Sequence, residues 1–327
     1  MSPAMKKVIV ATNSWYGPRI TLIRDMGFEE KMLPDRVDDS FRKEMATAHA
    51  LIPGLLMVDR KILEEAPHLV IVAAHGVGYN NVDLHTADEL GVLVTNSPGV
   101  NSDAVAEFTF GLMLSLARKI PQGDQEMKRG GWRRPELWGG ELREKTLSII
   151  GLGRIGSRVA RIGTAFGMEV LACDPYLREE NFREAGARPV SPEEAVVQAD
   201  FLTLHAPLTE ETRGMIGAGE LARMKKGAFL INTARGGIAD EEALVKALDQ
   251  GIIAGAGIDV FEEEPPADRR LAAHGRVLTS PHMAGLSDEA RYRMSQGAAE
   301  RVACALRGQT PPDVVNRPTH PRYLRKE

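Results

Sequence analysis

A glycine-rich turn between a predicted strand and a predicted helix constrains the fold of this chain most. Residues 146–156 have the sequence Thr-Leu-Ser-Ile-Ile-Gly-Leu-Gly-Arg-Ile-Gly, in which an apolar run precedes Gly151, Gly153 and Gly156. The spacing G-x-G-x-x-G allows a tight turn, close approach of a pyrophosphate and close packing of the helix on the strand. Apolar residues at helical spacing predict that helix over residues 154–166. The N-terminus of such a helix binds phosphate groups, so we predict a dinucleotide site.

An acidic residue after the next predicted strand indicates which dinucleotide binds. This strand, residues 168–173, ends at Asp174, which lies 174 − 156 = 18 residues beyond the last glycine. A carboxylate about 20 residues on typically binds the ribose hydroxyls. Pro175 and Tyr176 follow with no adjacent arginine for a 2′-phosphate, which favours NAD over NADP, although Arg178 is near. A glycine turn followed by an ordinary surface aspartate is the simpler alternative, but strand, turn, helix, strand and acid occur here in the expected order.

Composition limits the class of protein. The 327 residues suggest two domains, and a net charge of −4 with a pI of about 6.1 argues against a nucleic-acid partner. The two cysteines, Cys173 and Cys304, provide neither a disulfide framework nor a metal-binding spacing, so we expect no metal. No signal peptide and no apolar run of transmembrane length is apparent, which predicts a cytoplasmic enzyme with no membrane partner.

The first hundred residues alternate predicted strands and helices, the pattern of a parallel sheet covered on both faces. Strands are predicted at residues 7–11, 49–52, 69–74 and 92–95, and helices at 18–26, 61–66 and 82–89. A glycine-rich loop, residues 75–81, follows the third of these strands.

A long apolar helix is predicted over residues 102–117, with Ser102 as its N-cap and Pro121 beyond its end. Residues 122–144 are polar, are predicted to be irregular, and contain Trp132 and Trp138. They form either a surface excursion or an arm that contributes to a dimer interface, where tryptophans are common anchors. The sequence leaves both open.

The later predicted strands end in chemically distinctive residues, and ligands bind at the carboxyl ends of strands in open α/β sheets. The segments that follow these strands are His205-Ala206-Pro207, Asn232-Thr233-Ala234-Arg235-Gly236-Gly237, Asp259-Val260-Phe261-Glu262-Glu263-Glu264-Pro265 and Ser280-Pro281-His282-Met283-Ala284-Gly285. A guanidinium, a carboxylate and an imidazole at one edge of a sheet are suited to anion binding with acid–base catalysis. Each has a simpler interpretation as a surface arginine, a solvated acid or a capping histidine, but their joint order favours catalysis.

These motifs resemble those of the D-isomer-specific 2-hydroxyacid dehydrogenase family. The resemblance extends over most of the chain and includes His75–Asp83, Val100–Arg118 and Leu147–Gly156. It implies an α/β fold of two Rossmann-like doubly wound domains, with an NAD-binding domain (101–286) inserted into a discontinuous flavodoxin-like substrate domain (1–100 and 287–327). It also implies an NAD-dependent oxidoreductase that interconverts small 2-oxo and 2-hydroxy acids, and a homodimer formed through the nucleotide domains.

The resemblance further implies the role of each catalytic residue. Arg235 would bind the substrate carboxylate and polarise the reacting carbonyl, for which a planar guanidinium is well shaped. His282 would donate the proton in reduction and accept it in oxidation, since an unperturbed histidine titrates near pH ~6.5. Glu264 would orient His282; the family places its acid directly before a proline, which selects Glu264 from three consecutive glutamates.

The same resemblance implies the binding residues. Backbone N–H groups of Val77 and Gly78 would bind the substrate carboxylate beside Arg235 and His282, and Asp259 would lie near the nicotinamide. The implied cofactor contacts are Gly151, Gly153, Arg154, Ile155, Gly156, Asp174, His205, Pro207, Thr233, Ala234, Arg235, Asp259, His282, Ala284 and Gly285.

The substrate is indicated only by one loop, residues 51–57, which lacks Arg, Lys and Ser. This favours a small or apolar 2-oxo acid such as glyoxylate, hydroxypyruvate or a pyruvate homologue. Phosphoglycerate dehydrogenase is the alternative, but it would need cations near the phosphate and often carries a C-terminal regulatory domain, whereas this chain ends at Glu327. Formate-type members pair their histidine with glutamine, so Glu264 argues against formate.

Two other classes of protein remain open. An NAD(H)-sensing protein of the corepressor type shares the fold and the triad, although no basic or disordered interaction segment is evident beyond a short tail. A dinucleotide-binding protein of another reaction class would require Arg235, Glu264 and His282 to be incidental.

Overall fold

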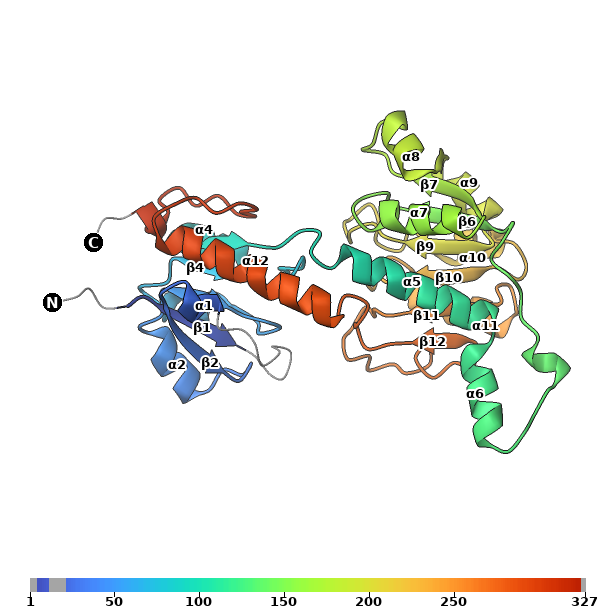
Figure 1. Cartoon of the computed structure of the whole chain (residues 1–327), viewed down its shortest axis with the longest axis horizontal. Coiled ribbons are helices and arrows are strands. Elements are labelled where there is room, and N and C mark those ends of the chain that lie inside the picture. Colours follow the sequence, from blue (N-terminus) through green and yellow to red (C-terminus); the bar gives the residue numbers. More distant parts are fainter. Residues whose placement is uncertain (1–4, 12–21, 325–327) are drawn as a thin grey trace. The chain divides into compact units, whose positions relative to one another are not determined.

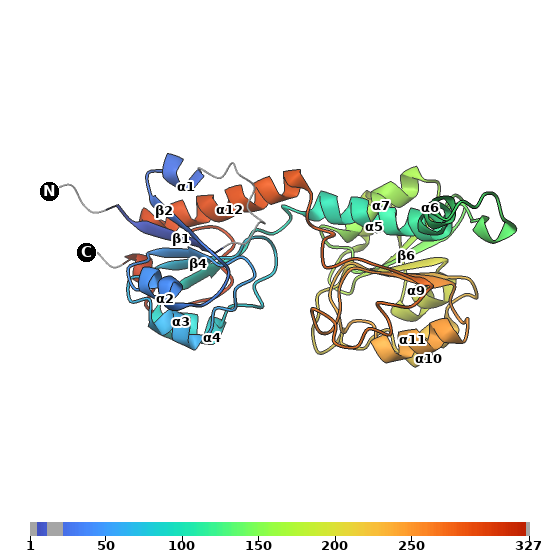
Figure 2. The ribbon, with the colours of Figure 1, turned by 90° about the horizontal axis from the view of Figure 1, so that it is seen from below.

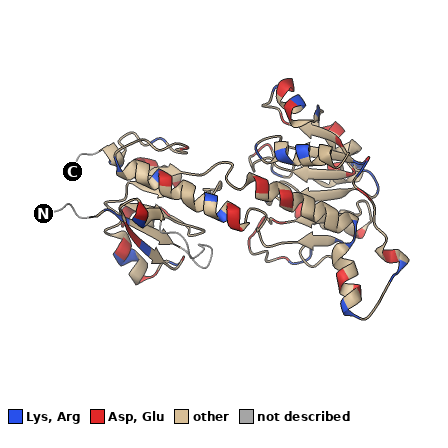
Figure 3. Ribbon diagram, viewed as in Figure 1, with Lys and Arg blue, Asp and Glu red and all other residues tan. Residues whose placement is uncertain are grey.

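The computed structural model describes residues 5–11 and 22–324. The chain divides into two compact units, of which unit 1 comprises Met1–Asn101 and Leu286–Glu327 and unit 2 comprises Ser102–Gly285. Each unit is built on one parallel sheet with helices on both faces, which confirms the α/β fold class (Figure 1). Acidic and basic residues are interspersed over both units (Figure 3).

Unit 1 contains a five-stranded sheet in the order β2-β1-β3-β4-β5, the flavodoxin-like order. The strands are β1 (Lys7–Ala11), β2 (Glu29–Leu33), β3 (Ala50–Ile52), β4 (Ile71–Ala73) and β5 (Leu93–Thr95). The helices are α1 (Leu22–Asp25), α2 (Asp39–Met45), α3 (Arg60–Glu64), α4 (Leu84–Leu90), α12 (Asp288–Leu306) and the 3-10 helix η2 (Arg322–Leu324). Helices α1 and α12 cover one face of the sheet, and α2, α3 and α4 cover the other (Figure 2).

Unit 2 contains a seven-stranded sheet in the order β12-β11-β10-β9-β6-β7-β8. The strands are β6 (Thr146–Ile150), β7 (Glu169–Cys173), β8 (Arg188–Pro189), β9 (Phe201–Leu204), β10 (Phe229–Asn232), β11 (Gly255–Ile258) and β12 (Val277–Thr279). The helices are α5 (Ser102–Ala117), α6 (Ile120–Lys128), η1 (Pro135–Leu137), α7 (Gly156–Ala165), α8 (Glu179–Ala185), α9 (Pro192–Gln198), α10 (Ala218–Arg223) and α11 (Glu241–Asp249). The strand order reverses at β6, which makes its carboxyl end the expected ligand position.

The structure corrects several predicted elements. Helix α1 is described over Leu22–Asp25, and residues 18–21 of its predicted span lie outside the described residues. Ser102 is the first residue of α5 rather than its N-cap. Pro121 lies beyond the end of α5, as predicted, and within the first turn of α6. The arm predicted to be irregular therefore begins as a helix. Proline fits there because the N–H groups of the first helical turn have no acceptor within the helix, so the missing N–H of proline costs no hydrogen bond.

Seven elements of the described chain were not predicted: β2, α2, α6, η1, α8, β8 and η2. Strand β2 has the sequence Glu-Glu-Lys-Met-Leu, of which only Leu33 is buried, and it lies at the edge of its sheet. Charged residues are tolerated and even favoured on edge strands, so hydrophobic patterning does not reveal it. Helix α6 likewise has no buried residue.

Candidate functional site

In the glycine-rich turn after β6, Gly151 and Gly156 are packed against backbone atoms, whereas Gly153 faces open space. Gly151 has φ +91°, and a Cβ there would lie 2.7 Å from the Ala206 nitrogen. A Cβ at Gly156 would lie 2.0 Å from the Gly151 carbonyl oxygen, so only glycine lets α7 begin this close to β6. At Gly153, by contrast, a Cβ would meet no described heavy atom within 4 Å. This open face before a helix N-terminus fits a pyrophosphate group.

The Asp174 carboxylate joins the carboxyl ends of β6 and β7. One oxygen accepts a hydrogen bond from the Leu152 N–H, within the glycine-rich turn, at 3.0 Å. The other accepts from the Tyr176 N–H at 3.1 Å. Because Asp174 is half-buried and held beside the turn, it is placed to receive the hydroxyls of a ribose attached to a phosphate bound there.

His205, after β9, is a neutral hydrogen-bonding group. Its Nε2 lies 2.9 Å from the Thr203 hydroxyl, and its buried Nδ1 has no hydrogen-bond partner among the described residues. Burial lowers the pKa of His205 to about 3. The ring therefore remains uncharged at neutral pH and does not compete with His282 as a proton source.

The turn after β10 presents Arg235. The Asn232 side chain folds this turn, because its Nδ2 donates to the Arg235 carbonyl oxygen at 2.9 Å and its Oδ1 accepts from the Ala234 N–H at 3.1 Å. The Arg235 guanidinium is partly exposed and donates to the Ala234 carbonyl oxygen at 2.7 Å. No role was predicted for Asn232, although asparagine at the end of a strand is a typical turn residue.

Glu264 and His282 form a hydrogen-bonded pair. The Nδ1 of His282 lies 2.7 Å from Oε2 of Glu264, and the Phe261 N–H donates to Oε1 at 3.1 Å. Burial disfavours ionisation of the carboxyl, but hydrogen bonds from His282 and Phe261 and the charges of His282 and Arg235 outweigh it, so the pKa of Glu264 lies below its ordinary value. The carboxylate remains ionised at neutral pH and loses its charge only as the pH falls through this lowered pKa.

The turns that carry Arg235 and Glu264 touch each other. A Cβ at Gly236 would lie 2.0 Å from the carbonyl carbon of Phe261 and 2.3 Å from the Glu262 nitrogen. The Glu262 N–H donates to Glu241, the first residue of α11, at 2.6 Å. The guanidinium and the carboxylate–imidazole pair are thus presented from backbones in direct contact.

Asp259 holds the turn that carries His282. Its carboxylate is buried; Oδ1 accepts from the Ser280 hydroxyl at 2.5 Å and the Met283 N–H at 2.9 Å, and Oδ2 accepts from the Ala284 N–H at 2.9 Å. His282 has φ +51°, a left-handed conformation that costs about 1–3 kcal/mol for a residue other than glycine. The family resemblance implied a place near the nicotinamide for Asp259; its hydrogen bonds to the His282 turn were not predicted.

The remaining predicted cofactor contacts occupy the same edge of the sheet in unit 2. Arg154 and Ile155 follow β6, Pro207 follows β9, Thr233 and Ala234 follow β10, and Ala284 and Gly285 follow β12. Val77 and Gly78 belong to unit 1, in the loop that follows β4.

We expect Glu264→Gln to move the pH–rate profile for reduction to lower pH. Removing the carboxylate charge disfavours the protonated imidazole that must supply the proton. At neutral pH we expect kcat/KM to fall by about tenfold or more, the effect of losing a hydrogen bond to a charged group. Initial rates of reduction across pH measure both effects.

Glu263→Gln is the matched control, because it removes an adjacent exposed carboxylate from the same acidic run. A Glu264→Gln profile that coincides with those of the wild type and Glu263→Gln would exclude Glu264 from the acid–base pair.

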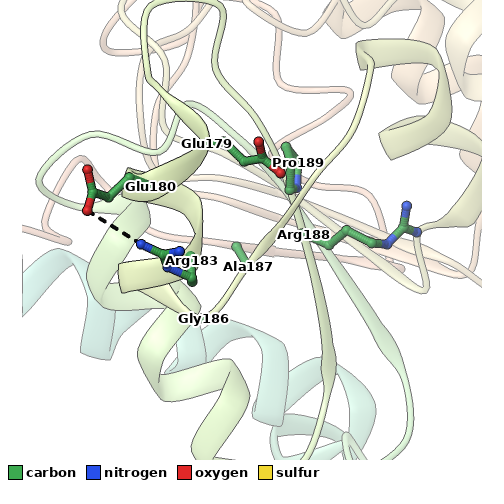
Figure 4. A pocket seen from close by; sticks show the side chains of 7 residues that line it. All are labelled: Glu179, Glu180, Arg183, Gly186, Ala187, Arg188 and Pro189. Carbon is green, nitrogen blue, oxygen red and sulfur yellow. Dashed lines mark hydrogen bonds and ion pairs between the residues drawn. The ribbon is translucent and has the colours of Figure 1, made fainter.

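Two surface cavities are lined by residues other than those predicted to form the site. One, of about 690 Å³, is lined by residues of α8 and β8, including Glu180 and Arg183, whose charged groups are 3.4 Å apart (Figure 4). The other, of about 540 Å³, lies beside the N-terminus of α11 and the acidic run. No predicted catalytic or cofactor-binding residue lines either cavity.

Comparison with known proteins identifies relatives over most of the chain. The sequence profile described as "D-isomer specific 2-hydroxyacid dehydrogenase, NAD binding domain" matches residues 110–284. A glyoxylate reductase from Aeropyrum pernix is 46% identical over 268 residues, which are 80% of each chain. A D-3-phosphoglycerate dehydrogenase from Methanocaldococcus jannaschii is 44% identical over 320 residues, 97% of this chain and 61% of the relative.

Among solved structures, D-lactate dehydrogenase from Aquifex aeolicus, complexed with NAD and lactic acid, superposes with a TM-score of 0.81. It is 30% identical, and the match covers 93% of this chain and 96% of that one.

Within the described residues, no helix combines the length and apolar composition needed to cross a bilayer.

Proposed function

Because this chain belongs to the D-isomer specific 2-hydroxyacid dehydrogenase family, and is thus an NAD-dependent oxidoreductase acting on 2-hydroxy acids, we propose that it reduces small 2-oxo acids such as glyoxylate and hydroxypyruvate. The observation that carries the catalytic assignment is the Glu264–His282 pair, whose turn is in direct contact with the turn of Arg235. The fit of the glycine-rich turn to a pyrophosphate and of Asp174 to a ribose supports NAD at this site.

In this proposal His282 moves the proton. Its Nδ1 faces Glu264, which leaves Nε2 as the atom that gives a proton to the substrate oxygen during reduction and takes it back during oxidation. The ionised Glu264 stabilises the imidazolium and fixes the ring orientation. Asp259 contributes indirectly, because it holds the left-handed turn from which the ring projects.

Arg235 binds and polarises the substrate. Its guanidinium pairs with the substrate carboxylate and stabilises the negative charge that develops on the reacting oxygen. NADH, when bound, supplies the hydride that reduces C2 of the 2-oxo acid. The backbone contact at Gly236 fixes the spacing between the Arg235 turn and the Glu264 turn, so both groups act on one substrate molecule.

The loop that follows β3 indicates which substrate side chains are accepted, and in particular whether they carry a distal charge. Leu55 and Met57 are 67% and 64% exposed, and the Asn81 Nδ2 holds the loop by donating to the carbonyl oxygens of Gly54 and Leu56. Two apolar side chains at the carboxyl end of the unit 1 sheet favour a substrate without a distal charge. A small 2-oxo acid meets this condition, whereas a phosphorylated one does not.

Reduction of 3-phosphohydroxypyruvate is the second candidate activity. Arg291 of α12 is near His75, the residue that precedes the Gly76–Gly78 loop, because the Ser295 hydroxyl contacts both the His75 imidazole and the Arg291 carbonyl oxygen. Such a cation, absent from the loop of residues 51–57, would suit a phosphate.

The deciding experiment is oxidation of NADH with glyoxylate, hydroxypyruvate, phenylpyruvate and 3-phosphohydroxypyruvate offered separately, and with NADPH in parallel. We expect turnover with NADH, the highest kcat/KM for glyoxylate or hydroxypyruvate, and lower activity with NADPH. Preference for 3-phosphohydroxypyruvate would overturn the substrate assignment. Tight NADH binding without turnover of any acid would favour an NAD(H)-sensing role instead.

A homodimer is also part of this proposal. Trp132 and Trp138 are 67% and 76% exposed in the arm between α6 and β6, and exposed tryptophans commonly anchor interfaces. Sedimentation of the purified chain measures its mass in solution, and a monomer would remove this role from the arm.

A further inference from the structure

The Gly76–Gly78 loop, which follows β4, is held by the turn that follows the neighbouring strand β5. The Ser97 N–H donates to the Gly76 carbonyl oxygen at 2.6 Å, and the Asn96 Nδ2 donates to the Val77 carbonyl oxygen at 2.8 Å. Asn96 and Ser97 are buried. Since a carbonyl oxygen only accepts, the contact also fixes which end of the Asn96 amide faces the loop.

These two hydrogen bonds determine where the loop's own N–H groups point. In a trans peptide the N–H is directed opposite to the C=O of the same unit. The carbonyls of Gly76 and Val77 are both drawn toward the Asn96–Ser97 turn, so the N–H groups of Val77 and Gly78 are both directed away from it. Neighbouring N–H groups on one side of a backbone form an anion-binding concavity.

Both N–H groups are available to a ligand. Gly78 is exposed and Val77 is partly exposed, and neither N–H donates a hydrogen bond to any part of the chain that the structure describes. Gly76 has φ +123°, a backbone conformation that residues other than glycine rarely adopt, so glycine suits the start of this loop.

The opposite side of the loop is held by α12. His75 Nε2 lies 2.9 Å from the Ser295 hydroxyl, which itself donates to the Arg291 carbonyl oxygen at 2.9 Å, so the imidazole is the donor in the first contact. A Cβ at Gly76 would lie 3.1 Å from the Met294 sulfur. The loop therefore cannot rotate its peptides without breaking contacts on both sides.

We propose that Asn96 is a positioning residue for substrate binding: it holds the Val77 carbonyl so that the Gly78 N–H is aimed at the carboxylate of the 2-oxo acid. The Ser97 backbone N–H holds the Gly76 carbonyl in the same way and aims the Val77 N–H. This inference rests on the function proposed above, because it takes the carboxylate as the ligand of these two N–H groups.

The test compares Asn96→Ala, which removes the donor, and the nearly isosteric Asn96→Asp, which places a carboxylate against the Val77 carbonyl oxygen. We expect KM for glyoxylate and hydroxypyruvate to rise by about tenfold to a hundredfold, as expected when hydrogen bonds to a charged group are lost. The inhibition constant of oxamate, a carboxylate of similar shape, should rise equally. We expect kcat to change by less than about threefold and the Kd of NADH to be unchanged.

Asn316→Ala is the matched control. Asn316 is equally buried in unit 1, where its amide bonds the Val94 N–H and the Val92 carbonyl oxygen along β5. It should lower thermal stability without changing KM or oxamate inhibition.

Three results would contradict the inference or its basis. A folded Asn96→Asp protein with the wild-type KM and oxamate inhibition would show that the contact only stabilises the fold. Equal changes of KM in the Asn96 and Asn316 variants would show the same. A wild-type protein that turns over none of the acids would overturn the proposed function itself, and the inference with it.

Discussion

Replacement of His282 by alanine is expected to abolish measurable turnover while NADH binding remains intact. Nε2 of His282 is the proposed proton donor, and positioned acid–base groups contribute about 10²- to 10⁴-fold to rate. The turn that carries the ring makes three hydrogen bonds to the Asp259 carboxylate, and the His282 N–H donates to the Asp259 carbonyl oxygen at 2.8 Å. None of these bonds involves the imidazole, so the turn should survive the change. Stopped-flow or steady-state reduction of glyoxylate measures the rate, and NADH fluorescence titration measures binding.

His274→Ala is the control for this change. His274 also pairs with a carboxylate of unit 2, because its Nε2 lies 3.3 Å from Asp249. It precedes β12, at the amino end of the strand, whereas the site residues follow the carboxyl ends of the strands. It should retain the wild-type kcat. If His282→Ala retains the wild-type kcat as well, the proton must come from another group and the proposed mechanism is wrong.

Replacement of Arg235 by lysine should lower kcat/KM by about 10²- to 10³-fold, the range found when a donor to a developing oxyanion is removed. Lysine keeps the positive charge, so the decrease in kcat/KM measures the contribution of the guanidinium geometry. An ammonium cannot bind a carboxylate through two parallel N–H groups. Because Arg235 would contact both the carboxylate and the reacting oxygen, we expect KM to rise and kcat to fall together. Steady-state kinetics with hydroxypyruvate separate the two terms.

Arg213→Lys is the corresponding control, since Arg213 pairs with the neighbouring Glu262 at 3.6 Å and is exposed. Its kinetics should match those of the wild type. A change in KM alone for Arg235→Lys would mean that Arg235 binds the substrate equally in the ground and transition states and does not stabilise the developing charge.

Much of the fold could be predicted because its strands are buried on both faces. The apolar run of residues 7–11 matched the buried strand β1 to the residue, and the glycine spacing placed the β6–α7 turn. The elements that were not predicted carry few buried residues: β2 is charged and lies at an edge, and α6 packs no side chain into a core. Strand β2 is positioned by the strand that it pairs with, and α6 by the segments that it connects. A local hydrophobic pattern contains neither kind of information.

The sequence predicted those site residues whose side chains are distinctive and directly follow a predicted strand. The pairing of Glu264 with His282 joins residues 18 apart, and only the family resemblance implied it. The contact of Asn96 with the Val77 carbonyl has no such signal, because its partner is a backbone atom that every residue possesses. The hydrogen bonds of Asp259 were hidden for the same reason: two of its three donors are backbone N–H groups.

The packing of α12 on the sheet of unit 1 has a consequence for how the chain matures during translation. Ala298, Ala299 and Val302 cover the face of the sheet that also contains Val8 and Ile71. The ribosome releases the strands of unit 1 first, but the helix that seals this face is made only after all of unit 2, which is continuous in sequence, has been synthesised. The first unit to begin is therefore the last to be completed, and its apolar face must be kept from aggregating for the time needed to translate about two hundred residues.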